Sequence, residues 1–84
     1  MIVIVPKENV NDDEVIVQNI NFKSKDKVKK YDPIIDLETS KTAIEIESPC
    51  DGYVVIKVSE GDEIPVGSVL FEVFETLDEL EQNT

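Results

Sequence analysis

The sequence is dominated by short strand-like segments, each bounded by turn-forming residues. Ala43 to Glu47 alternates apolar and acidic side chains with a period of two, the pattern of a strand with one buried face. We expect strands at residues 2–5, 15–22, 34–38, 43–47, 53–58 and 69–74. Strands separated by turns at intervals of roughly 8–12 residues are typical of sandwiches and barrels. The predicted fold is therefore all-β, a flattened barrel or sandwich of two small antiparallel sheets (a barrel-sandwich hybrid).

A faint internal repeat indicates that the two sheets are related. Residues 26–38 match residues 62–74 at an offset of 36 residues (62 minus 26), so that Asp26 falls on Asp62. Two similar halves in so short a chain predict sheets related by pseudo-twofold symmetry that together bury one core.

The inward positions of these strands define the expected core. Its predicted members are Val15, Val17, Ile20, Ile35, Leu37, Ile44, Ile46, Val54, Ile56, Phe71 and Val73. Residues 23–30 are expected to form an exposed loop in which Val28 alone points inward, and residues 59–67 a turn-rich connection. We assign residues 1–75 to one domain and residues 76–84 to an acidic tail, either a frayed terminus or the start of a linker.

The composition limits the partners that the chain can have. A length of 84 residues fits one small domain, and the net charge of −11 disfavours nucleic acid and anionic membranes, whose phosphates repel such a surface. The acidity favours basic protein partners, although a solvated acidic surface explains it equally well. The apolar start, residues 1–5, is too short for a signal or membrane segment. With Cys50 as its one cysteine, the chain can form no internal disulfide. We therefore expect a reducing compartment, either the cytoplasm or an organelle matrix.

Few residues are available for catalysis. The chain has no histidine, which removes the commonest general base and the commonest metal ligand. We interpret Cys50, which follows a proline in a turn, as a packing residue. The carboxylates are plentiful but lie on predicted loops or on the solvent side of a strand. We therefore expect neither an enzyme nor a metal site.

One lysine is distinguished by its position. Lys41 lies between two predicted strands, at a hairpin tip whose other residues are small and polar. Most exposed lysines only solvate a surface, but a long unbranched stem at a tip is also a natural handle for covalent attachment. An enzyme can reach it from several sides, and no packing depends on its charge.

Two stretches of the sequence resemble lipoyl domains, within the biotinyl/lipoyl attachment superfamily. ETSKTAIEIESPCDGYV, residues 38–54, is similar to the family's hairpin, in which a modified lysine follows Glu-Thr-Asp or Glu-Ser-Asp and precedes a strand that ends in a Pro…Gly turn. EGDEIPVGSVLFEV, residues 60–73, is similar to the family's last connection and strand. The resemblance covers about residues 2–75, and the pseudo-twofold repeat is also a family trait.

The resemblance implies a carrier that catalyses nothing. Lys41 would carry lipoate on its ε-amine, as a swinging arm of a 2-oxo acid dehydrogenase complex. Its partners would be a thiamin-dependent decarboxylase, an acyltransferase core and a flavin dehydrogenase, and a monomeric domain suffices for this role. Residues 7–14 would form a loop near the lysine that helps partners distinguish the domain. The residues implied in recognition by the lipoylating enzyme are Glu38, Thr39, Ser40 and Thr42.

Two other functions stay open. Biotin carriers usually flank the lysine with methionines, and Met1 is the chain's one methionine, so lipoate is favoured over biotin and carboxyl transfer. Ser40 and Thr42 stand where the family usually has Asp and Ala, which leaves an unmodified docking module fused to an acyltransferase of another pathway.

The turn before the hairpin also departs from the family pattern. Lys25 and Tyr31 stand where glycines are common. Because Tyr31 cannot take a positive φ cheaply, we expect that turn to differ.

Overall fold

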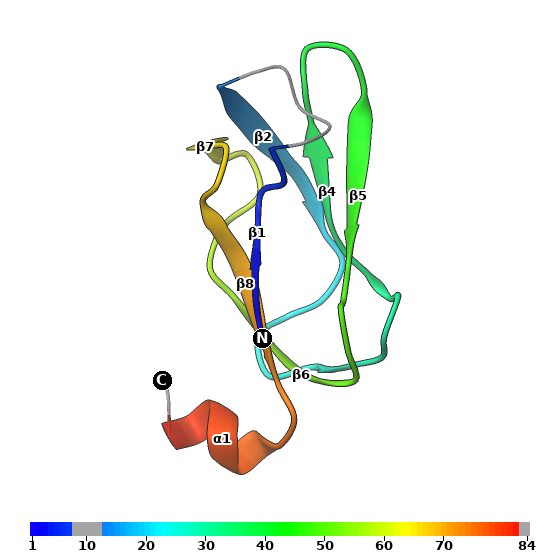
Figure 1. Cartoon of the computed structure of the whole chain (residues 1–84), viewed down its shortest axis with the longest axis vertical. Helices are drawn as coiled ribbons and strands as arrows, with labels where there is room; N and C mark the ends of the chain where they lie inside the picture. Colours follow the sequence, from blue (N-terminus) through cyan, green and yellow to red (C-terminus); the bar gives the residue numbers. More distant parts are fainter. Residues whose placement is uncertain (8–12, 83–84) are drawn as a thin grey trace.

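The computed structural model describes residues 1–7 and 13–82. Its strands are β1 (Ile2–Ile4), β2 (Glu14–Ile20), β3 (Lys27–Val28), β4 (Pro33–Glu38), β5 (Ala43–Glu47), β6 (Gly52–Ile56), β7 (Glu63–Pro65) and β8 (Val69–Phe74). One sheet has the order β1-β8-β6-β3 and the other β5-β4-β2-β7, and the pairs in both are antiparallel. The arrangement, shown in Figure 1, confirms the predicted all-β fold of two small antiparallel sheets.

Two of these strands lie in segments that were predicted as connections. β3 lies within residues 23–30 and pairs with β6, while β7 lies within residues 59–67 and pairs with β2. Runs of two or three residues cannot display a period of two, so the sequence pattern did not reveal them. Val28, in β3, is fully buried and points inward as predicted.

The pseudo-twofold repeat is present in both strands and turns. β4 and β8 each contain six residues. Equivalent aspartates stabilise equivalent turns through side-chain hydrogen bonds. Asp26 Oδ2 accepts a hydrogen bond from Lys23 N at 2.8 Å, and Asp62 Oδ2 accepts one from Ser59 N at 2.9 Å. The two halves of the chain therefore use the same turn chemistry.

The turn that was expected to differ keeps the geometry of its symmetry mate. Lys25 and Tyr31 have φ values of 78° and 76°, while the equivalent Gly61 and Gly67 have values of 91° and 93°. The expectation is therefore wrong, because two residues with side chains adopt the left-handed conformation here. The N–H of Lys25 donates to the carbonyl of Val54 at 2.6 Å, which holds the backbone in this turn. Such contacts offset part of the roughly 1–2 kcal/mol that the left-handed conformation costs each residue.

The core lies between the two sheets. The predicted members that are buried are Val15, Val17, Ile35, Leu37, Ile46, Val54, Phe71 and Val73. Ile20, Ile44 and Ile56 are only half-buried and pack against this core from its margin. The prediction is corrected for these three, which lie at or next to the ends of their strands, where less of the opposite sheet covers them.

Strict alternation fails where β4 and β8 begin. Ile34 and Leu70 are fully buried although the residues that follow them, Ile35 and Phe71, are buried as well. The β4–β5 pair shifts register between Pro33 and Ile35, and the β1–β8 pair shifts register at its equivalent end. A period-two pattern therefore missed both residues.

The segment that was predicted as a frayed tail or linker start forms a helix, α1 (Leu77–Gln82). Thr76 Oγ1 accepts a hydrogen bond from Glu79 N at 3.2 Å and so caps the helix, whose first turn is acidic as its dipole favours. Leu80 is fully buried against apolar residues of β6 and β8. The expectation of a frayed end is wrong for this helix, because capping and one buried leucine fix it to the sheet.

Figure 1 shows α1 at the opposite end of the molecule from the β4–β5 connection. Within the described residues, no helix combines the length and the apolar character that crossing a membrane requires.

Candidate functional site

The β4–β5 hairpin carries Lys41 at its tip. Glu38 pairs with Ala43 across the hairpin, so the turn consists of the four residues between them. Ser40, Lys41 and Thr42 are all exposed. Figure 1 shows this connection, in green, at one extreme of the long axis of the molecule. The structure therefore places Lys41 at an exposed hairpin tip, where the sequence pattern predicted it.

The side chain of Thr39 closes the tip. Its Oγ1 accepts hydrogen bonds from Thr42 N at 3.1 Å and Lys41 N at 3.3 Å, and donates one to Thr42 O at 2.9 Å. The backbone N–H of Thr39 donates to the same Thr42 carbonyl at 2.9 Å. Threonine hydroxyls stabilise turns in this way by replacing main-chain partners. The backbone at Lys41 is therefore held by hydrogen bonds within the turn.

The ammonium of Lys41 has no side-chain hydrogen bond or ion pair within residues 1–7 and 13–82. By contrast, the ammonium of Lys30 lies 5.2 Å from the ring centre of Tyr31. An amine that no described neighbour restrains can enter the active site of a modifying enzyme. Amide formation at its Nζ removes a charge on which no described contact of the fold depends.

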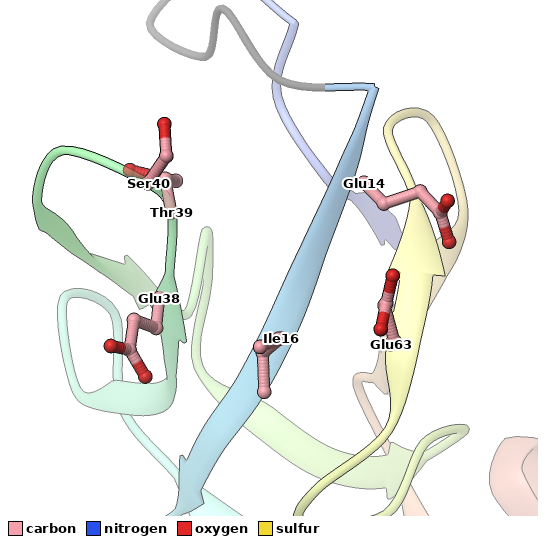
Figure 2. Close-up of a pocket in the computed structure, with 6 residues that line it drawn as sticks. All are labelled: Glu14, Ile16, Glu38, Thr39, Ser40 and Glu63. Atoms are coloured by element: carbon pink, nitrogen blue, oxygen red, sulfur yellow. The ribbon is translucent and has the colours of Figure 1, made fainter.

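A groove of about 390 Å³ lies beside the tip, on the outer face of the second sheet. It is lined by Glu14, Ile16, Glu38, Thr39, Ser40 and Glu63 (Figure 2). Ile16 of β2 is in register with both Glu38 of β4 and Glu63 of β7. The three side chains therefore form a row across three strands, with the apolar one in the middle.

The groove is a place of negative potential. Its three glutamates make no ion pair and no side-chain hydrogen bond with another residue of the described part of the chain. Like charges held this close reinforce one another's field. Ile16 is 42% exposed at the centre of the row. The arrangement suits a partner surface that presents cations on either side of an apolar group.

The structure brings the predicted recognition residues together around Lys41. Glu38 ends β4 and faces the groove, while Thr39, Ser40 and Thr42 form the turn itself. Of the predicted recognition loop, residues 8–12 lie outside the described residues, whereas Glu14 lines the groove.

Two residues of the groove were not predicted. Ile16 lies between the buried Val15 and Val17, so the alternation of β2 already contained the signal that it points outward. Glu63 lies in β7, which comes from the other half of the chain. Nothing in the local sequence shows that these two residues meet.

The chemistry available at the tip is that of a primary amine. Lys41 Nζ can form an amide with an activated carboxylic acid, which fits a covalently attached cofactor and requires no cavity to hold it. Among the described residues, no group of three or more His, Cys, Asp or Glu side chains is placed to hold a metal ion.

Comparison with known proteins agrees with this geometry. The family model Biotin_lipoyl, described as "Biotin-requiring enzyme", matches residues 3–73. The chain belongs to the biotin/lipoyl attachment family. Among solved structures, this biotin/lipoyl attachment domain is similar to the lipoyl domain of the 2-oxoglutarate dehydrogenase complex from Azotobacter vinelandii. That match has a TM-score of 0.76 and 26% sequence identity, and covers 90% of this chain and 98% of that one.

Two curated relatives are longer proteins. The dihydrolipoyllysine-residue acetyltransferase component of the pyruvate dehydrogenase complex of Acholeplasma laidlawii is 41% identical over 54 residues, which cover 63% of this chain and 10% of the relative. A glycine cleavage system H-like protein of Staphylococcus aureus is 34% identical over 56 residues, which cover 67% of this chain and 51% of the relative. The family and the lipoyl-domain fold make this chain a carrier domain and not an enzyme.

Proposed function

We propose that Lys41 carries lipoate in an amide bond at its Nζ. The observation that carries this proposal is the position of Lys41, exposed at the tip of a hairpin whose turn is closed by Thr39. Membership of the biotin/lipoyl attachment family supports a covalently attached lipoate or biotin. The similarity to a lipoyl domain and to a dihydrolipoyllysine-residue acetyltransferase supports lipoate.

In this proposal the protein presents Lys41 at the hairpin tip and lets the attached cofactor reach a partner. When bound, lipoate supplies a dithiolane that accepts an acyl group on sulfur. The lysine side chain extends this group beyond the hairpin tip, away from the two sheets. Because the arm stays tethered, its effective concentration at a docked partner exceeds that of a free cofactor.

We infer that the carrier serves a 2-oxo acid dehydrogenase type of complex, in the cytoplasm or a reducing organelle matrix. Two of the similar proteins are named as parts of such complexes. The partners would be the lipoylating enzyme, a thiamin-dependent decarboxylase, an acyltransferase core and a flavin dehydrogenase. The acidic groove adjoins the tip, so a partner that receives Lys41 also meets the groove.

A second assembly is favoured by a separate observation. The Staphylococcus aureus relative is named a glycine cleavage system H-like protein, which supports the same carrier role in a different system. Lys41 serves in both, and the two candidates differ only in the partners that meet the tip.

In vitro modification tests the carrier proposal. The purified chain is incubated with lipoate–protein ligase, lipoate and ATP, and in parallel with biotin–protein ligase, biotin and ATP. Intact mass should show one lipoyl group on the wild type and on Lys57→Arg, none on Lys41→Arg, and no biotin on any of them. Biotin on Lys41 would indicate carboxyl transfer. A wild type that neither ligase modifies would indicate an unmodified docking module.

A further inference from the structure

We propose that Thr39 is a positioning residue for the modification of Lys41: its hydroxyl holds the tip in the conformation that the modifying enzyme accepts. The inference rests on the proposed function, lipoylation of Lys41, and concerns the way the chain prepares that lysine. In this account Thr39 acts through the backbone of the turn and not by direct contact with the enzyme.

The hydrogen bonds of Thr39 use the full capacity of its hydroxyl. A hydroxyl has one donor and two acceptor sites. Here the donor bonds to Thr42 O at 2.9 Å, and the acceptor sites take the amides of Thr42 at 3.1 Å and Lys41 at 3.3 Å. In many β-turns the amide of the fourth residue donates to the main-chain carbonyl of the first. At this tip, the amide of Thr42 instead donates to the side chain of the first residue.

Burial separates Thr39 from the other residues of the tip. Thr39 is half-buried, whereas Ser40, Lys41 and Thr42 are exposed. The hydroxyl of Thr42 donates to the carbonyl of Ala43 at 3.3 Å and so bonds outside the turn. Thr39 therefore offers a side chain that is turned toward the backbone of Lys41.

Among the described residues, the turn residues do not belong to the hydrophobic core, whose nearest member in the hairpin is Leu37, with the half-buried Ile44 at its margin. Without the hydroxyl, the turn would populate several conformations, and only a fraction would present Lys41 correctly. The apparent affinity for the enzyme falls in proportion to that fraction. The chemistry of the bound amine is unchanged, so the effect belongs in KM and not in kcat.

Two substitutions at one position and one distant control test the inference. Thr39→Val keeps the β-branched shape and removes the hydroxyl, while Thr39→Ser keeps the hydroxyl. The matched control is Ser24→Ala, because the Ser24 hydroxyl also accepts a backbone amide, that of Ile56 at 2.9 Å. Figure 1 shows the connection that follows β2, which contains Ser24, far from the hairpin tip.

Two readouts are taken on each variant: the kinetics of lipoylation by purified lipoate–protein ligase at varied domain concentration, and amide hydrogen exchange at Lys41 and Thr42. We expect Thr39→Val to raise KM about tenfold at nearly unchanged kcat, and to speed exchange at both amides. Thr39→Ser should restore both quantities, and Ser24→Ala should leave both near wild type.

Three results would overturn the inference. Unchanged exchange in Thr39→Val would show that the hydroxyl does not hold the tip. Faster exchange with an unchanged KM would show that the enzyme does not require the fixed tip. A rise in KM in Thr39→Ser as large as in Thr39→Val would show that the hydroxyl does not account for the effect, because Thr39→Ser keeps the hydroxyl. Failure of the proposed function looks different, because the ligase would then leave the wild type unmodified while the exchange data still report on the tip.

Discussion

Tyr31 and Gly67 occupy equivalent positions in the two halves of the fold, and both adopt the left-handed backbone conformation, with φ values of 76° and 93°. Lys25 and Gly61 form a second such pair, with values of 78° and 91°. The pseudo-twofold fold therefore imposes one backbone geometry on both halves, although only the second half supplies glycine. The first half tolerates two strained residues, because hydrogen bonds from their amides fix the turn.

Replacing Lys25 with glycine should stabilise the protein. An L-residue in the left-handed conformation costs roughly 1–2 kcal/mol, and part of that gain is returned because glycine makes the unfolded chain more flexible. We expect Lys25→Gly to raise the free energy of unfolding by about 0.5–1 kcal/mol in urea titrations. Lys25 is exposed, so no packing is lost.

Lys25→Ala is the matched control for this prediction. It removes the same long side chain but keeps the Cβ that causes the strain, so it should not stabilise the protein. If alanine stabilised as much as glycine, the gain would come from removing the lysine charge and not from relief of backbone strain.

Truncating Leu80 should destabilise the protein although this residue lies in α1, outside the two sheets. Leu80 is fully buried, and burial of its side chain attaches α1 to the apolar residues of β6 and β8. Leu80→Ala should lower the free energy of unfolding by about 2–3 kcal/mol, as for leucines in other cores. Leu77 belongs to the same helix but is 42% exposed, so Leu77→Ala should change stability by less than about 0.5 kcal/mol. Equal effects of the two variants would mean that α1 does not pack on the sheet.

Most of the fold was predictable because its signals are local. The alternation of Glu45 and Glu47 with Ile44 and Ile46 is that of a strand with one buried face. What local patterns could not show depends on contacts between distant segments. The pairing of β3 with β6 and the packing of Leu80 on the sheet each join segments that are far apart in the sequence.

The acidic groove should contribute to partner binding through its charge. Glu38 and Glu63 flank Ile16 and lack ionic partners among the described residues, so replacing both with glutamine removes two negative charges at little cost to the fold. We expect Glu38→Gln/Glu63→Gln to slow the second-order rate of lipoylation several-fold at low ionic strength. The difference from wild type should shrink as salt is added, because exposed charges are screened beyond a Debye length of about 10 Å at 0.1 M.

A charge-matched variant controls for the net charge. Glu45 and Glu47 are exposed on β5 and do not line the groove, so Glu45→Gln/Glu47→Gln changes the net charge equally. It should alter the rate much less. If the two double variants slowed the reaction equally, the overall charge and not the groove would steer the partner.

The site was predictable to the extent that it lies within one hairpin. Lys41 and its neighbours are contiguous, so their place at an exposed tip follows from the strands on either side. The groove joins residues of three strands, and Glu63 reaches it only through the pairing of β2 with β7. The hydrogen bonds of the Thr39 hydroxyl could not be predicted either, since the residue type alone does not show which backbone groups the hydroxyl meets.

The central claim is that Lys41 is the attachment point of lipoate, and peptide mass mapping of the chain purified from its native host tests it most directly. Digestion followed by fragmentation of the peptide that contains Thr39 to Glu47 locates any modification on a single residue. The account predicts a lipoyl group on Lys41, with the other lysines unmodified. A bare Lys41, in cells in which other lipoyl proteins are modified, would contradict it.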